Sequence, residues 1–136
     1  MGDILLRQMS NRDKDFYKIM GPFLSRREIV AELGNSVWDD DGKDWFVAID
    51  KGAVLGFVAA VLAHGKVQFC SDYVLPEHRN SGVYDRIFEA RLAAYPSEEI
   101  AATVTPMSLP CYEAHGFIKT GMRGKYIVVK REVSHE

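Results

Sequence analysis

The most informative stretch of the sequence is Val74-Leu75-Pro76-Glu77-His78-Arg79-Asn80-Ser81-Gly82-Val83-Tyr84. An apolar run ends there, a short polar loop follows, and a helical pattern begins within the last residues. The first turn of a helix leaves backbone N–H groups without intrahelical partners, and these groups attract anions. Gly82 lets an anion approach the backbone, and Arg79 adds a positive charge. The stretch therefore predicts a phosphate or diphosphate site; spacing alone equally allows a plain turn with a surface arginine.

The segments on either side of this turn predict how the sheet is connected. A strand over residues 67–74, a helix over 82–95 and a strand over 100–104 form a unit that favours a parallel pair with a right-handed crossover. Upstream, strands over 45–49 and 54–62 are separated from each other and from the 67–74 strand by short turns, which indicates an antiparallel meander. The 54–62 strand is almost entirely apolar, so we expect it to be covered on both faces.

The remaining segments complete an α+β fold of the α/β type in one domain, residues 1–136. A strand over 4–9 precedes two short helices that are broken near Gly21-Pro22 and end at Gly34. A short helix over 109–115 and two strands, 117–122 and 125–129, follow the 100–104 strand. We expect a mixed, mostly antiparallel sheet of about seven strands with helices on both faces, in the order β-α-α-β-β-β-α-β-α-β-β.

Composition excludes several classes of protein. The chain has 136 residues and a net charge of −2, so we expect no nucleic-acid partner. Its two cysteines, Cys70 and Cys111, form no CxxC pair, and no metal site is expected. The N-terminus does not have the pattern of a signal peptide, and the longest apolar stretch is too short to span a bilayer. We therefore expect a cytoplasmic protein without a membrane partner.

Two motifs resemble the GNAT N-acetyltransferase superfamily. Val74-x-Pro76-x-x-Arg79-x-x-Gly82 is similar to the acyl-CoA signature of that family, and Tyr112-Glu113-Ala114-His115-Gly116-Phe117 is similar to its Y-E-x-x-G-F element. The expected order of elements agrees over nearly the whole chain. GxGxxG and Walker patterns are absent, which argues against nicotinamide dinucleotides and nucleoside triphosphates as ligands. The resemblance implies an acyltransferase that uses acetyl-CoA as co-substrate, without a metal.

The resemblance also implies roles for individual residues. Backbone amides along the turn would hold the diphosphate of CoA, and these belong to Arg79, Asn80, Ser81, Gly82, Val83 and Tyr84. The main chain of Tyr73, Val74 and Leu75 would pair with the pantetheine arm, and the Val74 N–H would donate to the thioester oxygen. Tyr84 stands where the family usually has Gly or Ala, so its side chain must point away from the diphosphate, or the loop must differ.

The chemistry of acyl transfer needs an acid and a base. Tyr112 would be the general acid that protonates the leaving thiolate, although a buried aromatic with a bonded phenol is the alternative. An amine that is protonated at pH 7 must lose a proton to attack. Gln68 occupies the position of a glutamate base in some relatives and could only order a water. Asp72 is the candidate base nearest to the point where the parallel strands would separate for substrate. Alternatively, its carboxylate accepts hydrogen bonds from nearby backbone N–H groups at the end of the strand. Glu77, His78 and His64 are further candidates.

Three functions follow from these residues. The first is an acetyl-CoA-dependent N-acetyltransferase in which a bound primary amine attacks the thioester directly. The second is a GNAT-fold module, catalytically weak or inactive, that binds acyl-CoA or a protein. The third, with little support, is a thiol hydrolase using Cys70 or Cys111. The acceptor is a small-molecule or protein amine, and the acidic run over residues 39–44 could attract it. Tyr126, Ile127 and Val129 belong either to a homodimer edge or to the core.

Overall fold

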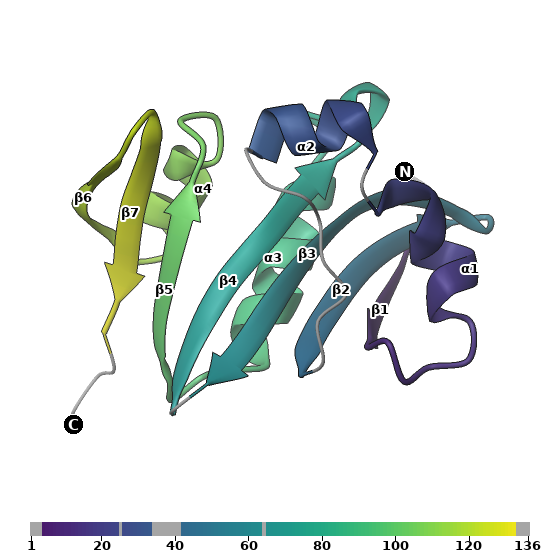
Figure 1. The fold of residues 1–136 in the computed structure, drawn as a ribbon, viewed down its shortest axis with the longest axis horizontal. Coiled ribbons are helices and arrows are strands. Elements are labelled where there is room, and N and C mark those ends of the chain that lie inside the picture. The colour runs from purple at the N-terminus through teal and green to yellow at the C-terminus, as the bar shows by residue number, and fades with distance from the viewer. Residues whose placement is uncertain (1–3, 25, 34–41, 64, 133–136) are drawn as a thin grey trace.

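A seven-stranded sheet organises the chain, in the strand order β1-β2-β3-β4-β5-β7-β6 (Figure 1). The computed structural model describes residues 4–24, 26–33, 42–63 and 65–132. The strands are β1 (Leu5–Met9), β2 (Lys43–Asp50), β3 (Ala53–Ala63), β4 (Lys66–Val74), β5 (Glu99–Val104), β6 (Ile118–Arg123) and β7 (Tyr126–Arg131). Only the β4–β5 pair is parallel among the described strand pairs. The predicted meander, crossover and mixed sheet are thereby confirmed.

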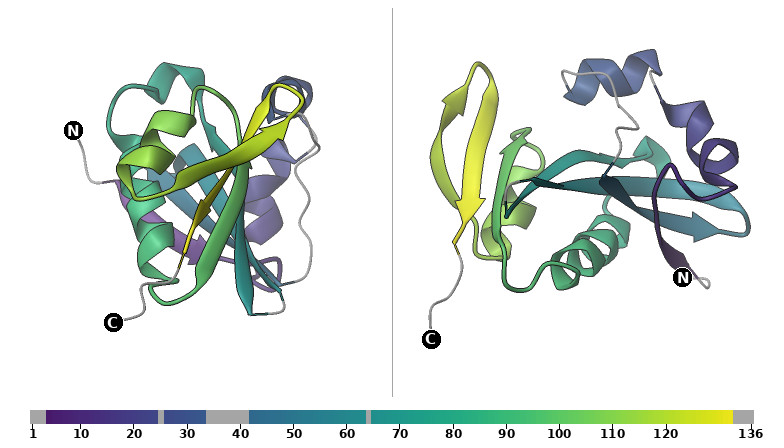
Figure 2. Two further views of the ribbon diagram at one scale, coloured as in Figure 1. Left: turned by 90° about the vertical axis from the view of Figure 1, so that its left-hand side faces the viewer. Right: turned by 60° about the horizontal axis from the view of Figure 1, so that its bottom comes forward.

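Helices cover both faces of the sheet, as Figure 2 shows. One face carries α1 (Phe16–Met20), a 3-10 turn (Gly21–Phe23) and α2 (Arg27–Leu33), and the other carries α3 (Val83–Ala93) and α4 (Leu109–Ala114). The break at Gly21-Pro22 falls where the sequence predicts it. None of the helices in the described ranges is long and apolar enough to cross a membrane.

Two apolar cores result from the alternation of side chains along the strands. On β2, Phe46 faces the core under α3, and its neighbours Trp45 and Val47 face the core under α1 and α2. β3 lies between β2 and β4, and four consecutive residues, Phe57 to Ala60, are fully buried. The prediction that this strand is covered on both faces is confirmed.

The sheet opens at the end of β4. The parallel pairing of β4 and β5 ends at Phe69 and Ala102, but β4 continues to Val74. Along the β3–β4 pair the register shifts by one residue between Cys70 and Tyr73, and Ser71 there has a positive φ of 57°. A bulge adds one residue to the strand and bends it. β4 therefore leaves β5, and the opening faces the start of α3.

The C-terminal hairpin settles one open alternative. Ile127 and Val129 are buried in the core under α3, so these two do not form an exposed edge, while Tyr126 is half-buried. The outer strand is β6, whose Ile118 and Met122 are exposed. A homodimer stays a prediction.

Candidate active site

The turn between β4 and α3 has the backbone geometry of an anion site. A 3-10 turn (Pro76–His78) leads into Asn80 and Gly82, whose φ values are +61° and +87°. α3 then starts at Val83, and the Arg86 N–H donates to the Gly82 carbonyl. This is the first hydrogen bond within α3, so the N–H groups of residues 83–85 have no acceptor inside the helix and are available to an anion. A Cβ on Gly82 would meet no atom within 4 Å, so the positive φ, not space, selects glycine there.

The Arg79 side chain ties three elements together. Its Nε donates to the Val74 carbonyl at 2.8 Å, and its Nη2 donates to Glu32 on α2 at 2.7 Å. From the sequence, Arg79 is expected to offer its positive charge to a phosphate. In the structure that charge is already paired with a carboxylate, so the backbone amides would carry most of the attraction for an anion.

The Val74 amide points into the opening of the sheet. The Leu75 N–H donates to the Leu55 carbonyl on β3 at 2.9 Å, so Leu75 faces β3. Backbone groups of successive strand residues point to opposite sides, and the Val74 N–H therefore points away from β3, toward β5. Gly56 on β3 makes this close packing possible, because a Cβ there would lie 2.9 Å from the Tyr73 carbonyl oxygen. The main chain of Tyr73, Val74 and Leu75 was predicted to pair with a pantetheine arm. Of these groups, the Val74 N–H is the one whose direction fits that prediction.

A cavity of about 250 Å³ lies at this opening. It reaches from the end of β4 and the turn to α2 and the loop before α4. Its walls consist of Glu32, Asp72, Tyr73, Val74, His78, Arg79, Asn80, Gly82, Tyr84, Asp85, Met107 and Ser108. The turn predicted to bind a phosphate and the end of β4 thus share one cavity.

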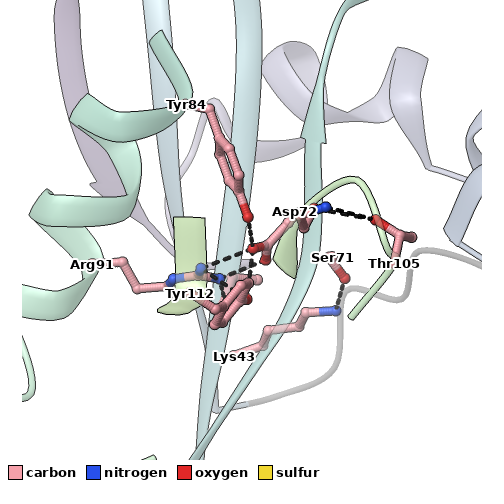
Figure 3. A network of polar contacts seen from close by, with 9 residues as sticks. Lys43, Ser71, Asp72, Tyr84, Arg91, Thr105 and Tyr112 are labelled. Carbon is pink, nitrogen blue, oxygen red and sulfur yellow. Dashed lines mark hydrogen bonds and ion pairs between the residues drawn. The ribbon is translucent and has the colours of Figure 1, made fainter. Parts of the chain in front are cut away.

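A polar network centred on Asp72 adjoins the cavity (Figure 3), and two of its members, Asp72 and Tyr84, line the cavity. The Asp72 carboxylate accepts hydrogen bonds from the Tyr84 and Tyr112 hydroxyls, each at 2.6 Å. It also accepts both Nη groups of Arg91, at 2.6 and 2.9 Å. Four donors from α3 and α4 therefore converge on one side chain of the β4 bulge. The sequence also allowed Asp72 to be a carboxylate bonded to backbone N–H groups. In the structure the donors to its carboxylate are instead the side chains of Tyr84, Arg91 and Tyr112.

Arg91 belongs to the network around Asp72, and it was not among the residues predicted from the sequence. Its side chain is fully buried, donates to the Ala59 carbonyl at 3.1 Å, and stacks 3.9 Å from the Phe69 ring. Burial is the largest influence on the pKa of Arg91 and lowers it, but the charge and hydrogen bonds of Asp72, together with the two phenols Tyr112 and Tyr84, outweigh burial, so the net pKa is raised. The signal was present, because Arg91 lies three residues after Phe88 on the apolar stripe of α3. Glu32 was missed as well, since only the fold brings α2 to Arg79.

The opposite side of the bulge is held by a second cation. Lys43 is buried, donates to the Ser71 hydroxyl at 3.0 Å, and lies 4.5 Å from the Trp45 ring centre. Ser71 and Asp72 thus point to opposite faces of the sheet, and each contacts a buried basic side chain (Figure 3). This double attachment fixes the strained bulge from which the cavity wall is built.

The two phenols differ in their access to the cavity. Tyr84 lines it, and its side chain points to Asp72 and away from the turn, as the sequence analysis expected of a bulky residue there. Tyr112 is 1% exposed and lies between Phe88 and Phe117, with its hydroxyl also accepting from Arg91. Burial, with Asp72 next, raises the pKa of Tyr84 well above its usual value, and burial does the same for Tyr112. Both phenols therefore hold their protons tightly.

The other candidate bases are scattered. Gln68 and Glu77 are exposed, and His78 is half-buried and lines the cavity. His64, and residues 39–41 of the acidic run, lie outside the described residues. Of the predicted catalytic and binding residues, the structure gathers Asp72, Tyr112 and the turn in one region.

Thiol chemistry finds little support. Burial raises the pKa of Cys70, and burial together with a hydrogen bond to Asp85 raises the pKa of Cys111 to about 12. A thiolate is the reactive form, so both thiols are inert near neutral pH. Within the described ranges no group of three or more metal-binding side chains occurs.

Comparisons with known proteins identify the fold. No family model matches the sequence, and no curated protein matches it. Among solved structures, an acyl-CoA N-acyltransferase from Pseudomonas aeruginosa has a TM-score of 0.75 at 16% identity, covering 95% of this chain and 99% of the other. Escherichia coli ElaA has a TM-score of 0.74 at 13% identity, covering 96% and 100%. The PaiA N-acetyltransferase from Thermoplasma acidophilum, solved with coenzyme A, has a TM-score of 0.65 at 12% identity, covering 96% and 99%. From its first strand to its C-terminal hairpin, this chain has the fold of the GNAT acetyltransferases.

Proposed function

We propose that this protein is an N-acetyltransferase that moves an acetyl group from acetyl-CoA to a primary amine. The observation that carries the proposal is the shared cavity, in which the separated end of β4 meets the N-terminal turn of α3. Ligands of α/β folds bind where strands separate and where helix amides point outward. The left-handed Asn80 and Gly82 fit a diphosphate, and structural neighbours with bound coenzyme A and acetyl-CoA have the same fold.

Each part of the cavity has one task in this proposal. Acetyl-CoA supplies an acetyl group activated as a thioester. The Arg79 N–H already donates to the Pro76 carbonyl at 3.3 Å, so the amides of residues 80–84 bind the diphosphate. The Val74 N–H stabilises the negative charge that develops on the carbonyl oxygen. The amine attacks directly, with both substrates bound and no covalent enzyme intermediate.

The proton transfers are the part that the network constrains most. We keep Asp72 as base and Tyr112 as acid among the proposed roles, but neither acts as a free group. Asp72 has its oxygens occupied by four donors, and Tyr112 is enclosed. His78, which lines the cavity, is the further base to test. A Tyr112→Phe enzyme that keeps its full rate would remove Tyr112 from the mechanism.

The acceptor in this proposal is a cationic amine, either a small molecule or a protein group, in the cytoplasm. Glu32 and Asp72 are paired with Arg79 and Arg91, so the exposed Asp85 is the carboxylate of the cavity wall that would attract an ammonium group.

Binding and transfer are tested separately. Isothermal titration with acetyl-CoA measures binding, and intact-mass analysis of an amine panel and of a cell lysate measures acetylation. Saturable binding with an acetylated product supports the proposal. The absence of binding at millimolar acetyl-CoA would refute it.

Two observations favour a second candidate, a GNAT-fold binding module that transfers nothing. The Tyr84 ring takes up space in the cavity, and Asp72 is held in an ion pair. Acetyl-CoA binding without any product across the amine panel would support this candidate instead.

A further inference from the structure

Tyr84 lines the cavity and is held in place both by its ring and by its hydroxyl. The Tyr84 ring packs edge-to-face against Phe88, with centroids 5.9 Å apart, and its hydroxyl donates to Asp72 at 2.6 Å. Asp72 is itself held by Arg91, whose side chain is fully buried. The ring therefore cannot turn aside without breaking a hydrogen bond to a carboxylate, which is among the stronger bonds in proteins.

The polar groups around Tyr84 suit a short acyl group and not a long hydrocarbon chain. Tyr84 and Asp72 both line the cavity, and Asp72 is 10% exposed. A methylene gains free energy only when it moves from water into apolar surroundings. A chain that extends toward Asp72 would instead cover a charged carboxylate and remove its remaining water, at a cost.

We propose that Tyr84, held in place by Asp72, restricts the acyl donor to the acetyl group. The diphosphate would lie at the turn and the thioester near Val74, so a longer acyl chain is directed at the Tyr84 hydroxyl and the Asp72 carboxylate. Tyr84 is thus a specificity-determining residue. Its side chain excludes longer acyl chains, while its backbone amide helps to bind the coenzyme. This inference rests on the proposed function, because it assumes that the cavity binds acyl-CoA.

Non-reactive S-alkyl thioethers of coenzyme A test the inference by binding alone. Isothermal titration compares S-ethyl-CoA with S-hexyl-CoA on the wild type, Tyr84→Ala, Tyr84→Phe and Tyr17→Ala. Tyr17 is an exposed helical tyrosine on α1, so its substitution is the matched control. Circular dichroism shows whether each variant is folded.

We expect the wild type and Tyr17→Ala to bind S-hexyl-CoA at least about tenfold more weakly than S-ethyl-CoA, a difference of about 1.4 kcal/mol. Tyr84→Ala should bind the two equally or prefer the hexyl compound. Tyr84→Phe, which keeps the ring and loses the bond to Asp72, should fall between them.

Two results would overturn the inference while leaving the proposed function intact: equal binding of both thioethers by the wild type, or an undiminished preference for ethyl in Tyr84→Ala. If coenzyme A and both thioethers fail to bind any of the four folded proteins, the proposed function fails, and the inference fails with it.

Discussion

Replacing Asp72 by leucine leaves the Arg91 guanidinium buried without its counter-charge. Arg91 would retain the Ala59 carbonyl at 3.1 Å and the Tyr112 hydroxyl at 3.1 Å, both neutral partners. Breaking a buried ion pair by removing one partner costs about 3–5 kcal/mol. We expect Asp72→Leu to lose that much, and Arg91→Met to lose toward the lower end, since Asp72 keeps its two phenol donors.

The double variant Asp72→Leu/Arg91→Met should be far more stable than the sum of the two losses implies. Exchanging both members of a buried pair for apolar residues is often nearly neutral. Both phenols lose their acceptor, but Tyr84 lines the cavity, where its hydroxyl can bond to solvent. The larger remaining cost is the Tyr112 hydroxyl, which is 1% exposed, at about 1–3 kcal/mol. Adding Tyr112→Phe removes that cost.

Urea unfolding followed by circular dichroism measures these free energies for the four variants and the wild type. The cycle should show a coupling of at least about 3 kcal/mol between Asp72 and Arg91. A loss below about 1 kcal/mol for Asp72→Leu, or strictly additive losses in the double variant, would refute the view that the pair is buried and mutually dependent.

Three further predictions test the turn, the bulge and the thiols. Gly82→Ala places a side chain at a φ of +87°, so it should cost about 1–2 kcal/mol of stability and weaken coenzyme A binding, whereas Gly124→Ala, at +61° in a hairpin, should cost stability alone. Equal affinities in a titration of both variants would place the diphosphate elsewhere. Gly56→Ala brings a Cβ to 2.9 Å from a carbonyl oxygen of β4 and should cost about 1–3 kcal/mol in urea unfolding, while Gly121→Ala, with no atom within 4 Å, should change little; similar values for both would contradict the close approach of β3 and β4. The Cys111 thiol, with a pKa of about 12, should react with iodoacetamide more slowly than an unfolded control at neutral pH and accelerate only as the pH rises toward that value, and rapid labelling of the folded protein would disprove its protection.

Local signals in the sequence predicted most of the fold. The change from alternating or continuous apolar runs to a helical stripe located the strands and α3, and the strand-helix-strand unit implied the parallel β4–β5 pair. Gly82 and the start of α3 predicted the anion turn, because a positive φ and unpaired helix amides depend on neighbouring residues alone. The element order followed from these same signals, whereas the resemblance to the GNAT superfamily rests on two residue motifs, over residues 74–82 and 112–117.

The side-chain contacts around Asp72 and Arg79 exist only in the folded chain. Asp72 meets Arg91 across 19 positions and Tyr112 across 40, and Arg79 meets Glu32 across 47. The helical spacing puts Arg91 on the apolar stripe of α3, but a charged residue on a helix is normally solvated, so this spacing alone does not predict its burial. Its charge is tolerated in the core because the β4 bulge delivers a carboxylate to it, and that encounter exists only once α3 packs on the sheet.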